Sequence, residues 1–133
     1  MKTGSKRADG FTLIELMIVM AIIVILAGIA TAMYVNSIQR SKEAVLKSDL
    51  FRMRDAIDQY YADKNKYPAS LDALVSEKYL RTVPVDPMTN STDTWQTTMA
   101  EPQPGSSFSD TGIFDVKSGA EQTALDGTRY ADW

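Results

Sequence analysis

The sequence predicts an α+β fold in which one long N-terminal helix packs on a small antiparallel β-sheet. Three observations predict this fold class. Residues 16–39 are uncharged and mostly apolar, and after them apolar residues recur every three or four positions among charged ones, which is the spacing of an amphipathic helix. Beyond residue 64, prolines, glycines and short segments of mixed polarity replace that spacing, which is typical of turns and strands.

This pattern divides the chain into four parts. A short polar leader is followed by the hydrophobic half of the long helix, by its amphipathic half, and by a globular head that ends in a C-terminal loop. The boundaries are 1–10 for the leader, 11–39 and 40–63 for the two halves of the helix, and 64–133 for the head.

Composition limits the functions that the chain can have. It contains neither cysteine nor histidine, so a disulfide framework, a thiolate site, a Ser-His triad and the common zinc ligand sets are excluded. About 90 residues lie outside the apolar segment, enough for a modest head but not for a large enzyme core. We therefore expect no enzymatic activity. The 17 acidic and 14 basic residues give a formal charge of −3, which argues against nucleic acid as a partner.

Charge is distributed unevenly along the chain. The leader holds three of the 14 basic residues and one of the 17 acidic ones, which leaves 11 basic and 16 acidic residues beyond residue 10. A basic flank stays in the cytoplasm under the positive-inside rule, so the acidic remainder should be translocated. This predicts a single-pass membrane protein whose head lies on the far side of the membrane.

Two ordinary interpretations of the first 40 residues leave one feature unexplained. A secretory signal peptide fits the basic start and a small-residue site at Ala30-Thr31-Ala32, but the apolar run is about twice the usual 7–15 residues and Glu15 interrupts its start. A single-pass anchor fits the length, because the 24 uncharged residues can cross about 30 Å of hydrocarbon. Neither explains Glu15, since placing an acid in a bilayer costs about 2.5–3.5 kcal/mol.

The residues around Glu15 provide a third interpretation. The run from Gly10 through Phe11 to Glu15, Gly-Phe-Thr-Leu-Ile-Glu, resembles the class III (prepilin) signal of type IV pilins and of type II secretion pseudopilins. The resemblance implies a pilin-like fold, cleavage after Gly10 by a membrane-bound prepilin peptidase, and N-methylation of the new terminus, Phe11, by a methyltransferase. It also identifies Glu15 as the glutamate of the family's signal.

Glu15 would then acquire a charge partner. Cleavage would leave a positive amine on Phe11, four residues before Glu15 and on the same face of the helix, about one turn away. We expect this amine to neutralise the carboxylate, either in the same subunit or in a neighbour stacked along a filament. The alternative is an acid that only extends to the membrane interface.

The amphipathic half presents one apolar face that can pack on a sheet. We expect a continuous helix over residues 11–63, because neither proline nor glycine interrupts its second half. Two ion pairs of i,i+4 spacing are expected on the charged side, Glu43–Lys47 and Arg54–Asp58. The apolar positions are Leu46, Leu50, Met53, Ile57 and either Tyr60 or Tyr61.

The hydrophobic half departs from the family's pattern at two positions. Pilin-type helices usually have proline where this chain has Ala32, and often glycine where it has Val24. Without the proline, the backbone hydrogen bond is kept and no kink is required. Local melting of the helix on assembly, which the resemblance implies, is then expected only near Gly28.

The head should begin with a turn and a second, short helix. Pro68 follows the end of the long helix, and Ser70 can cap a helix from Leu71 to about Tyr79. Strands are expected at Thr94–Met99 and Ile113–Lys117. A sheet of three or four antiparallel strands would bury the apolar face of the long helix.

Motifs in the head narrow the resemblance to the major pseudopilins of type II secretion systems. The matching segments are 67–74, 79–87, 112–119 and the final Asp132-Trp133. The resemblance implies a structural subunit of a pseudopilus, a homo-oligomeric filament anchored in the inner membrane with its heads in the periplasm. Its partners would be minor pseudopilins and an inner-membrane assembly platform. A type IV pilin for adhesion, motility or DNA uptake is the first alternative, and a small membrane-anchored or secreted binding protein is the second.

Many proteins that this chain resembles bind calcium in the C-terminal loop. Ca²⁺ takes about 6–8 oxygen ligands, including several carboxylates that lie close together. Here the loop offers only the scattered Glu121, Asp126 and Asp132, so we expect no cofactor and leave calcium as an alternative. The other interpretation is a surface loop that is held down by Trp133.

Overall fold

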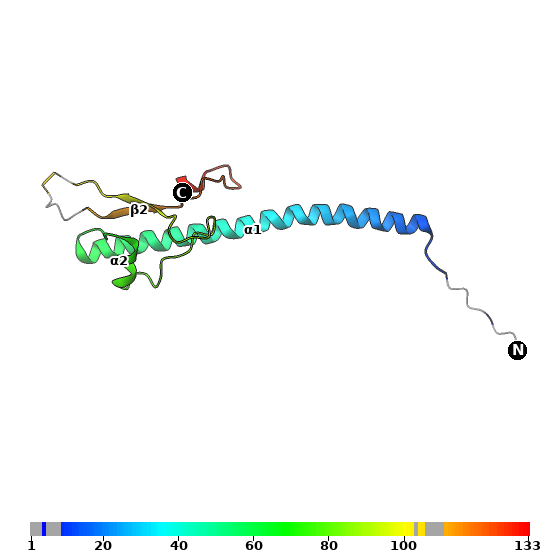
Figure 1. Ribbon diagram of the computed structural model, residues 1–133, viewed down its shortest axis with the longest axis horizontal. Coiled ribbons are helices and arrows are strands. Elements are labelled where there is room, and N and C mark those ends of the chain that lie inside the picture. Colours follow the sequence, from blue (N-terminus) through cyan, green and yellow to red (C-terminus); the bar gives the residue numbers. More distant parts are fainter. Residues whose placement is uncertain (1–3, 5–8, 103, 106–110) are drawn as a thin grey trace. The chain divides into compact units, whose positions relative to one another are not determined.

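The computed structural model describes residues 4, 9–102, 104–105 and 111–133 (Figure 1). The elements follow the order α1, α2, β1, β2 and a single 3₁₀ turn, η1. The chain forms two compact units, Met1–Ser37 and Ile38–Trp133, which we call the N-terminal unit and the head unit. The bounds of the elements are Leu13–Lys64 for α1, Leu71–Ser76 for α2, Gln96–Met99 for β1, Ile113–Lys117 for β2 and Tyr130–Asp132 for η1.

The N-terminal unit contains the first part of α1, which is preceded by the exposed, non-helical residues 9–12. By length and composition alone, α1 can cross a membrane, because an 18-residue window has a mean hydropathy of 2.9. None of that window is buried within the protein. Apolar side chains lie on every side of the helix here, so they need lipid or other helices around them.

The head unit is built around the apolar face of α1. The expected stripe is confirmed, and its last member is Tyr60, which is 6% exposed, and not Tyr61, which is 44% exposed. Residues from the rest of the head close over this stripe. They are Leu74, Trp95, Ile113, Val116, Ala120, Ala124 and Tyr130, which together with Leu46, Leu50, Met53, Ala56, Ile57 and Tyr60 form the core.

Helix α2 has the predicted start but ends earlier than predicted. Ser70 is its N-cap, and its side-chain oxygen accepts a hydrogen bond from the backbone N–H of Ala73 at 3.2 Å. The helix ends at Ser76 because Lys78 adopts a left-handed backbone conformation (φ 66°). The backbone N–H groups of Tyr79 and Leu80 then both donate to the carbonyl of Leu74, which closes the last turn.

The sheet is smaller than predicted. Strands β1 and β2 pair in antiparallel fashion, with Gln96 opposite Lys117 and an irregularity between Thr98 and Met99. The expected third and fourth strands are wrong for the residues that the structure describes, which hold only this two-stranded sheet and two isolated bridges. The segment before β1 forms a tight turn that begins with Asp86-Pro87, in which Asp86 pairs with Ser91.

Strand β1 also begins two residues later than predicted. The side chain of Trp95 enters the core, and its indole N–H donates to the carbonyl of Pro84 at 2.8 Å. Gly119 lies against the backbone of Thr94, the residue before Trp95. A Cβ added to Gly119 would be 2.1 Å from the carbonyl oxygen of Thr94. Only glycine permits this close approach of the two chain segments.

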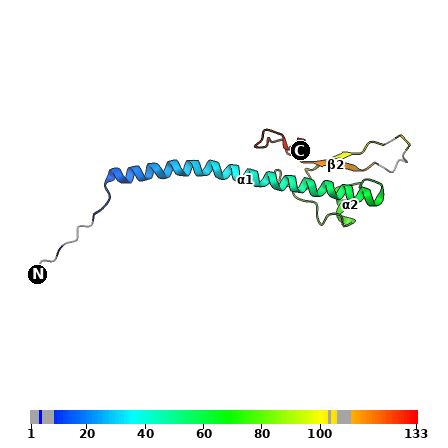
Figure 2. The same ribbon diagram turned by 180° about the vertical axis from the view of Figure 1, so that it is seen from behind.

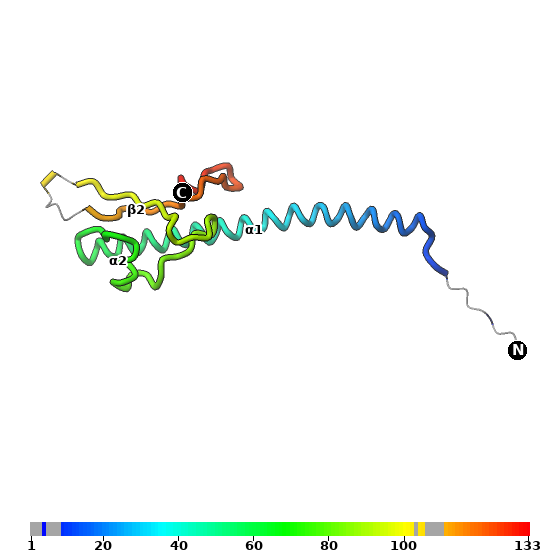
Figure 3. The backbone as a smooth tube through the Cα atoms, viewed as in Figure 1, coloured from blue at the N-terminus to red at the C-terminus, as the bar shows by residue number. Residues whose placement is uncertain are grey.

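The C-terminal segment folds back onto α1 within the head unit. The hairpin of β1 and β2 and the C-terminal segment lie on the same side of α1 (Figure 3), and the view from behind agrees (Figure 2). Tyr130, which is 1% exposed, anchors the segment in the core. Its ring meets the indole of Trp133 edge to face, with 5.1 Å between the ring centroids.

Candidate functional site

The segment predicted to be processed lies outside the helix. Gly10 and Phe11 are exposed and have no regular secondary structure, and α1 begins two residues after Phe11, at Leu13. The side chain of Phe11 is 89% exposed. A protease needs access to the peptide bond that it cleaves, and the exposed, non-helical junction between Gly10 and Phe11 offers that access.

Glu15 forms a reciprocal cap at the start of α1. Its carboxylate oxygen Oε2 accepts a hydrogen bond from the backbone N–H of Thr12 at 3.1 Å. In return, the backbone N–H of Glu15 donates to Oγ1 of Thr12 at 3.3 Å. This arrangement is a capping box, in which two of the unpaired N–H groups of the first turn find acceptors. It explains why the helix begins at Leu13.

Sequence reasoning missed this cap, although its signal is present. Threonine followed three residues later by glutamate, before an apolar run, is the usual signature of a capping box. The structure thus gives the Glu15 carboxylate a partner one residue from Phe11. The nitrogen of Phe11 is in a peptide bond with Gly10 here, so the pairing of Glu15 with a free amine stays a prediction.

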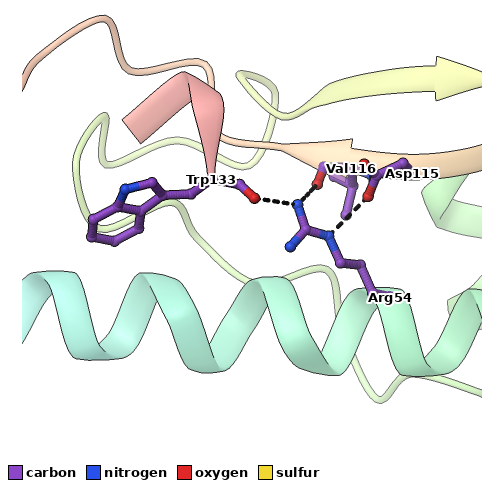
Figure 4. Close-up of polar contacts among 4 residues, drawn as sticks. All are labelled: Arg54, Asp115, Val116 and Trp133. Carbon is purple, nitrogen blue, oxygen red and sulfur yellow. Dashed lines mark hydrogen bonds and ion pairs between the residues drawn. The ribbon is translucent and has the colours of Figure 1, made fainter. Parts of the chain in front are cut away.

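Arg54 ties α1 to both β2 and the C-terminal segment (Figure 4). Its Nε forms an ion pair with Oδ1 of Asp115 at 2.8 Å. Its Nη2 donates to the main-chain oxygens of Val116, at 3.0 Å, and Trp133, at 2.8 Å. The predicted pair of Arg54 with Asp58 is therefore wrong, because the guanidinium points across the fold instead of along the helix.

The second predicted ion pair is also wrong. Glu43 Oε1 accepts hydrogen bonds from the hydroxyl of Tyr130 at 2.8 Å and from the backbone N–H of Leu125 at 2.9 Å. The ammonium group of Lys47 lies over the ring of Trp133, 4.5 Å from its centroid, as a cation–π contact. Both charged groups thus bind the returning C-terminal segment. Burial is the main cause that raises the pKa of the Tyr130 hydroxyl.

A buried carboxylate holds the end of β2 against the turn before β1. Asp86 is fully buried, and its Oδ2 accepts a hydrogen bond from the hydroxyl of Ser118 at 2.5 Å. Its Oδ1 accepts another from the backbone N–H of Met88 at 2.9 Å, as is typical of a turn that starts at aspartate. Burial, together with the nearby charge of Asp86, raises the pKa of Asp49 on α1, while Arg52 opposes this effect.

The carboxylates of the C-terminal loop do not form a metal-binding group. Among the described residues, no three or more acidic side chains are grouped so that they could hold a metal ion. Glu121, Asp126 and Asp132 therefore do not form such a group. Oδ1 of Asp126 accepts hydrogen bonds from both the hydroxyl, at 2.6 Å, and the backbone N–H, at 2.9 Å, of Thr128. These bonds, the hydroxyl's first, hold the pKa of Asp126 below its usual value.

Trp133 holds this loop against the rest of the head. It packs on the core, and its indole N–H donates to the hydroxyl of Thr128 at 2.6 Å. These contacts agree with the interpretation of this segment as a surface loop that Trp133 holds down.

Comparisons with known proteins identify the family. Residues 5–31 match a family described as the prokaryotic N-terminal methylation motif, and this segment includes Gly10, Phe11 and Glu15. The type II secretion system core protein G of Aeromonas hydrophila is 31% identical over 101 residues, which cover 64% of this chain and 71% of that protein. The chain belongs to the same pilin-like family as this core protein G. A protein of the same name from Pseudomonas aeruginosa is 33% identical to this pilin-like chain over 101 residues, with the same coverage.

Fimbrial and pilin relatives match shorter parts of the chain, over 57 to 81 residues. The type IV major fimbrial protein FimA of Dichelobacter nodosus is 53% identical over 57 residues, which cover 43% of this pilin-like chain and 36% of that protein. These relatives are named as core and fimbrial proteins, and none of the names is that of an enzyme. No solved structure gives a significant match.

Proposed function

We propose that this pilin-like chain is a structural subunit of a pseudopilus that drives type II protein secretion. The observation that carries the proposal is the extent of the alignments. Those with the two type II secretion core G proteins reach 101 residues, well beyond the N-terminal motif, whereas those with fimbrial and pilin proteins cover 57 to 81. The relatives give no reason to expect catalysis, so the proposed work of the chain is mechanical.

In the proposed order of events, the subunit is first inserted in the inner membrane and processed there. The chain would insert with a single span, its leader in the cytoplasm and its head in the periplasm. A prepilin peptidase would cleave after Gly10, and a methyltransferase would then methylate the amine of Phe11. The methylation motif in residues 5–31 and the exposed, non-helical Gly10–Phe11 junction support this step.

The processed subunit would then leave the lipid for a filament. In the isolated chain, the apolar side chains of the N-terminal unit are exposed, which water does not tolerate over so large a surface. Lipid would cover them before assembly, and the same segments of neighbouring copies would cover them afterwards. Minor pseudopilins and an assembly platform in the inner membrane are the further partners that this proposal requires.

The mass and N-terminal sequence of the mature protein test the processing step. The expected result is a chain that starts with N-methylated Phe11. A mature chain that starts at Met33 would instead indicate a conventional signal peptide cut after Ala30-Thr31-Ala32, and would contradict the proposal. Such a result would favour the second alternative, a small secreted or membrane-anchored binding protein.

A type IV pilin for adhesion, motility or DNA uptake is the alternative that the relatives also favour. The 53% identity to FimA supports it, although over a shorter part of the chain. Deletion of the gene separates the two roles. Loss of extracellular enzymes with surface filaments intact is the expected outcome, and loss of surface filaments with secretion intact would overturn it in favour of the pilin.

A further inference from the structure

The head unit exposes one large aromatic side chain beside a groove. Phe51, on α1, is 70% exposed, more than any other large hydrophobic side chain in the described part of the head unit. The groove next to it has a volume of about 480 Å³. Leu50, Phe51 and Trp133 form its apolar wall, and Lys47, Arg54 and Asp126 contribute its polar groups.

Contacts within the head hold this groove in shape. Arg54 is fixed by its bonds to Asp115, Val116 and Trp133, and the indole of Trp133 is fixed by Thr128. The ammonium of Lys47 rests on the indole. A partner would therefore meet a preformed surface, and little conformational entropy would be lost on binding. Phe51 itself makes no comparable contact with an aromatic ring among the described residues.

We propose that this groove, with Phe51 at its edge, binds the head of a second copy of the chain during assembly. The inference rests on the proposed function as a filament subunit. It adds to that function a defined contact outside the membrane-spanning segment.

Continuity along α1 favours a second copy as the occupant. The same helix carries the apolar segment that needs neighbouring copies in a filament and, further along, Phe51. Copies that pack through residues 13–37 of α1 would bring the following turns of the same helix close to one another. An exposed phenylalanine in those turns is then positioned for an interface between subunits.

Charge also favours a second copy. The groove is lined by two cations, Lys47 and Arg54, and one carboxylate, Asp126, which already accepts two hydrogen bonds from Thr128. The chain as a whole is acidic, with 17 acidic against 14 basic residues. The net charge of another copy is therefore opposite in sign to that of the rim of the groove, which favours encounter between them.

Lipid is a less suitable occupant. Lys47 lies eight residues beyond Gln39, the last residue of the uncharged run, which is about 12 Å along a helix. The groove would thus lie outside the hydrocarbon layer, and its polar rim does not match acyl chains. Lipid remains an outcome that the experiment below distinguishes.

Site-specific photo-crosslinking in cells tests the contact directly. The full-length chain with Phe51→p-benzoylphenylalanine keeps an aromatic side chain at the position and is irradiated under conditions in which filaments assemble. The matched control carries the same residue in place of Phe114, which is 54% exposed but does not line the groove. The expected product has twice the mass of the subunit, and both of its peptides come from this chain.

The other outcomes each count against the inference. An adduct of residue 51 with lipid or with a different protein would overturn it, as would no adduct in cells that assemble filaments. An equal yield of dimer from residue 114 would show that the groove is not a specific contact. Because the chain contains no cysteine, disulfide dimers cannot account for the product.

Truncation at the same position provides an independent measurement. Phe51→Ala should lower the yield of filaments about tenfold, as expected when an aromatic residue that becomes buried in an interface is removed. Phe114→Ala should lower it much less, and both variants should still lose their leader. Normal filaments from Phe51→Ala would overturn the inference alone, whereas a wild-type chain that never forms filaments would overturn the proposed function as well.

Discussion

At the scale of single residues, Glu15 combines a structural contact with a proposed electrostatic role. In the structure, its carboxylate caps the first turn of α1 together with Thr12. In the proposed filament, the same carboxylate would neutralise the amine of Phe11. The two roles are compatible, because the N–H group that it binds belongs to the residue directly after Phe11. They are also separable, because a capping box accepts glutamine as well as glutamate.

Glu15→Gln and Glu15→Ala therefore distinguish the charge from the cap. Both variants should still be cleaved after Gly10 and both should assemble poorly, because neither carries a charge to pair with the amine. Leader cleavage by mass spectrometry and filament yield by sedimentation are the measurements. If Glu15→Gln forms filaments as well as the wild type, the carboxylate acts only as a cap and the pairing is wrong.

Asp49 is a second residue whose charge has a predictable effect. Its pKa is raised in the folded state, mainly by burial and further by Asp86, so the folded protein binds this proton more tightly than the unfolded chain does. The free energy of unfolding should therefore fall as the pH rises from the ordinary value of 3.8 through the raised pKa.

Asp49→Asn should remove this pH dependence. At neutral pH the variant should melt a few degrees higher than the wild type, while at pH 3 the two should be alike, because Asp49 is then protonated in both states. Thermal unfolding of the full chain in detergent, measured at several pH values, is the test. A variant that melts lower than the wild type at neutral pH would mean that the charged form stabilises the head.

At the scale of elements, the sequence predicts α1 well because α1 depends on local signals. Its expected bounds were 11–63, and the structure has Leu13–Lys64. The apolar stripe was also predicted correctly, since periodicity alone determines which face of a helix is buried. The two-residue difference at the start comes from the capping box, which is itself readable in the sequence as Thr12 followed by Glu15.

Contacts between elements could not be predicted in the same way. Spacing on a helix suggested that Arg54 pairs with Asp58, but it takes no account of Asp115 or of the oxygen of Trp133, which come close only after folding. The number of strands was overestimated for a similar reason, because strand formation depends on pairing partners that a local pattern does not reveal. The segment around Asp86 is held in a turn by hydrogen bonds to its buried side chain.

Removal of the Arg54 side chain should loosen three elements together. Arg54→Ala deletes one ion pair and two hydrogen bonds to main-chain oxygens, so it should lower the free energy of unfolding by about 1–3 kcal/mol. Asp58→Ala, the control, removes only the partner that helix spacing suggested and should change it by less than about 0.5 kcal/mol. Denaturant unfolding, monitored by tryptophan fluorescence, measures both changes. A larger effect from Asp58→Ala than from Arg54→Ala would indicate that Asp58 makes the more important contact, as helix spacing suggested.

At the scale of the whole molecule, the chain joins a part that needs other molecules to a part with its own core. The N-terminal unit has no buried window in its apolar helix, whereas the head unit has a core drawn from α1, α2, β2 and the C-terminal segment. Membership of the pilin-like family follows from comparison, and Gly10, Phe11 and Glu15 lie within the segment that matches the methylation motif. Their roles in processing stay predictions.

The absence of an acidic cluster in the described loop leads to a prediction for the whole protein. If no calcium stabilises the head, a chelator should leave the melting temperature unchanged, because only a ligand that binds the folded state can raise it. The measurement compares thermal unfolding of the full chain in detergent with EDTA and with added Ca²⁺. A melting temperature that falls in EDTA and recovers with Ca²⁺ would show that the loop carboxylates bind the ion after all.

The two tryptophans of the chain lie in different surroundings, and this has a practical consequence. Trp95 is 7% exposed within the core, whereas Trp133 borders the groove beside Lys47. With Trp95→Phe, the emission of the protein would come from one indole at the surface where we expect another subunit to bind. Its spectrum would then act as a built-in optical reporter, able to follow filament growth in real time without any attached dye.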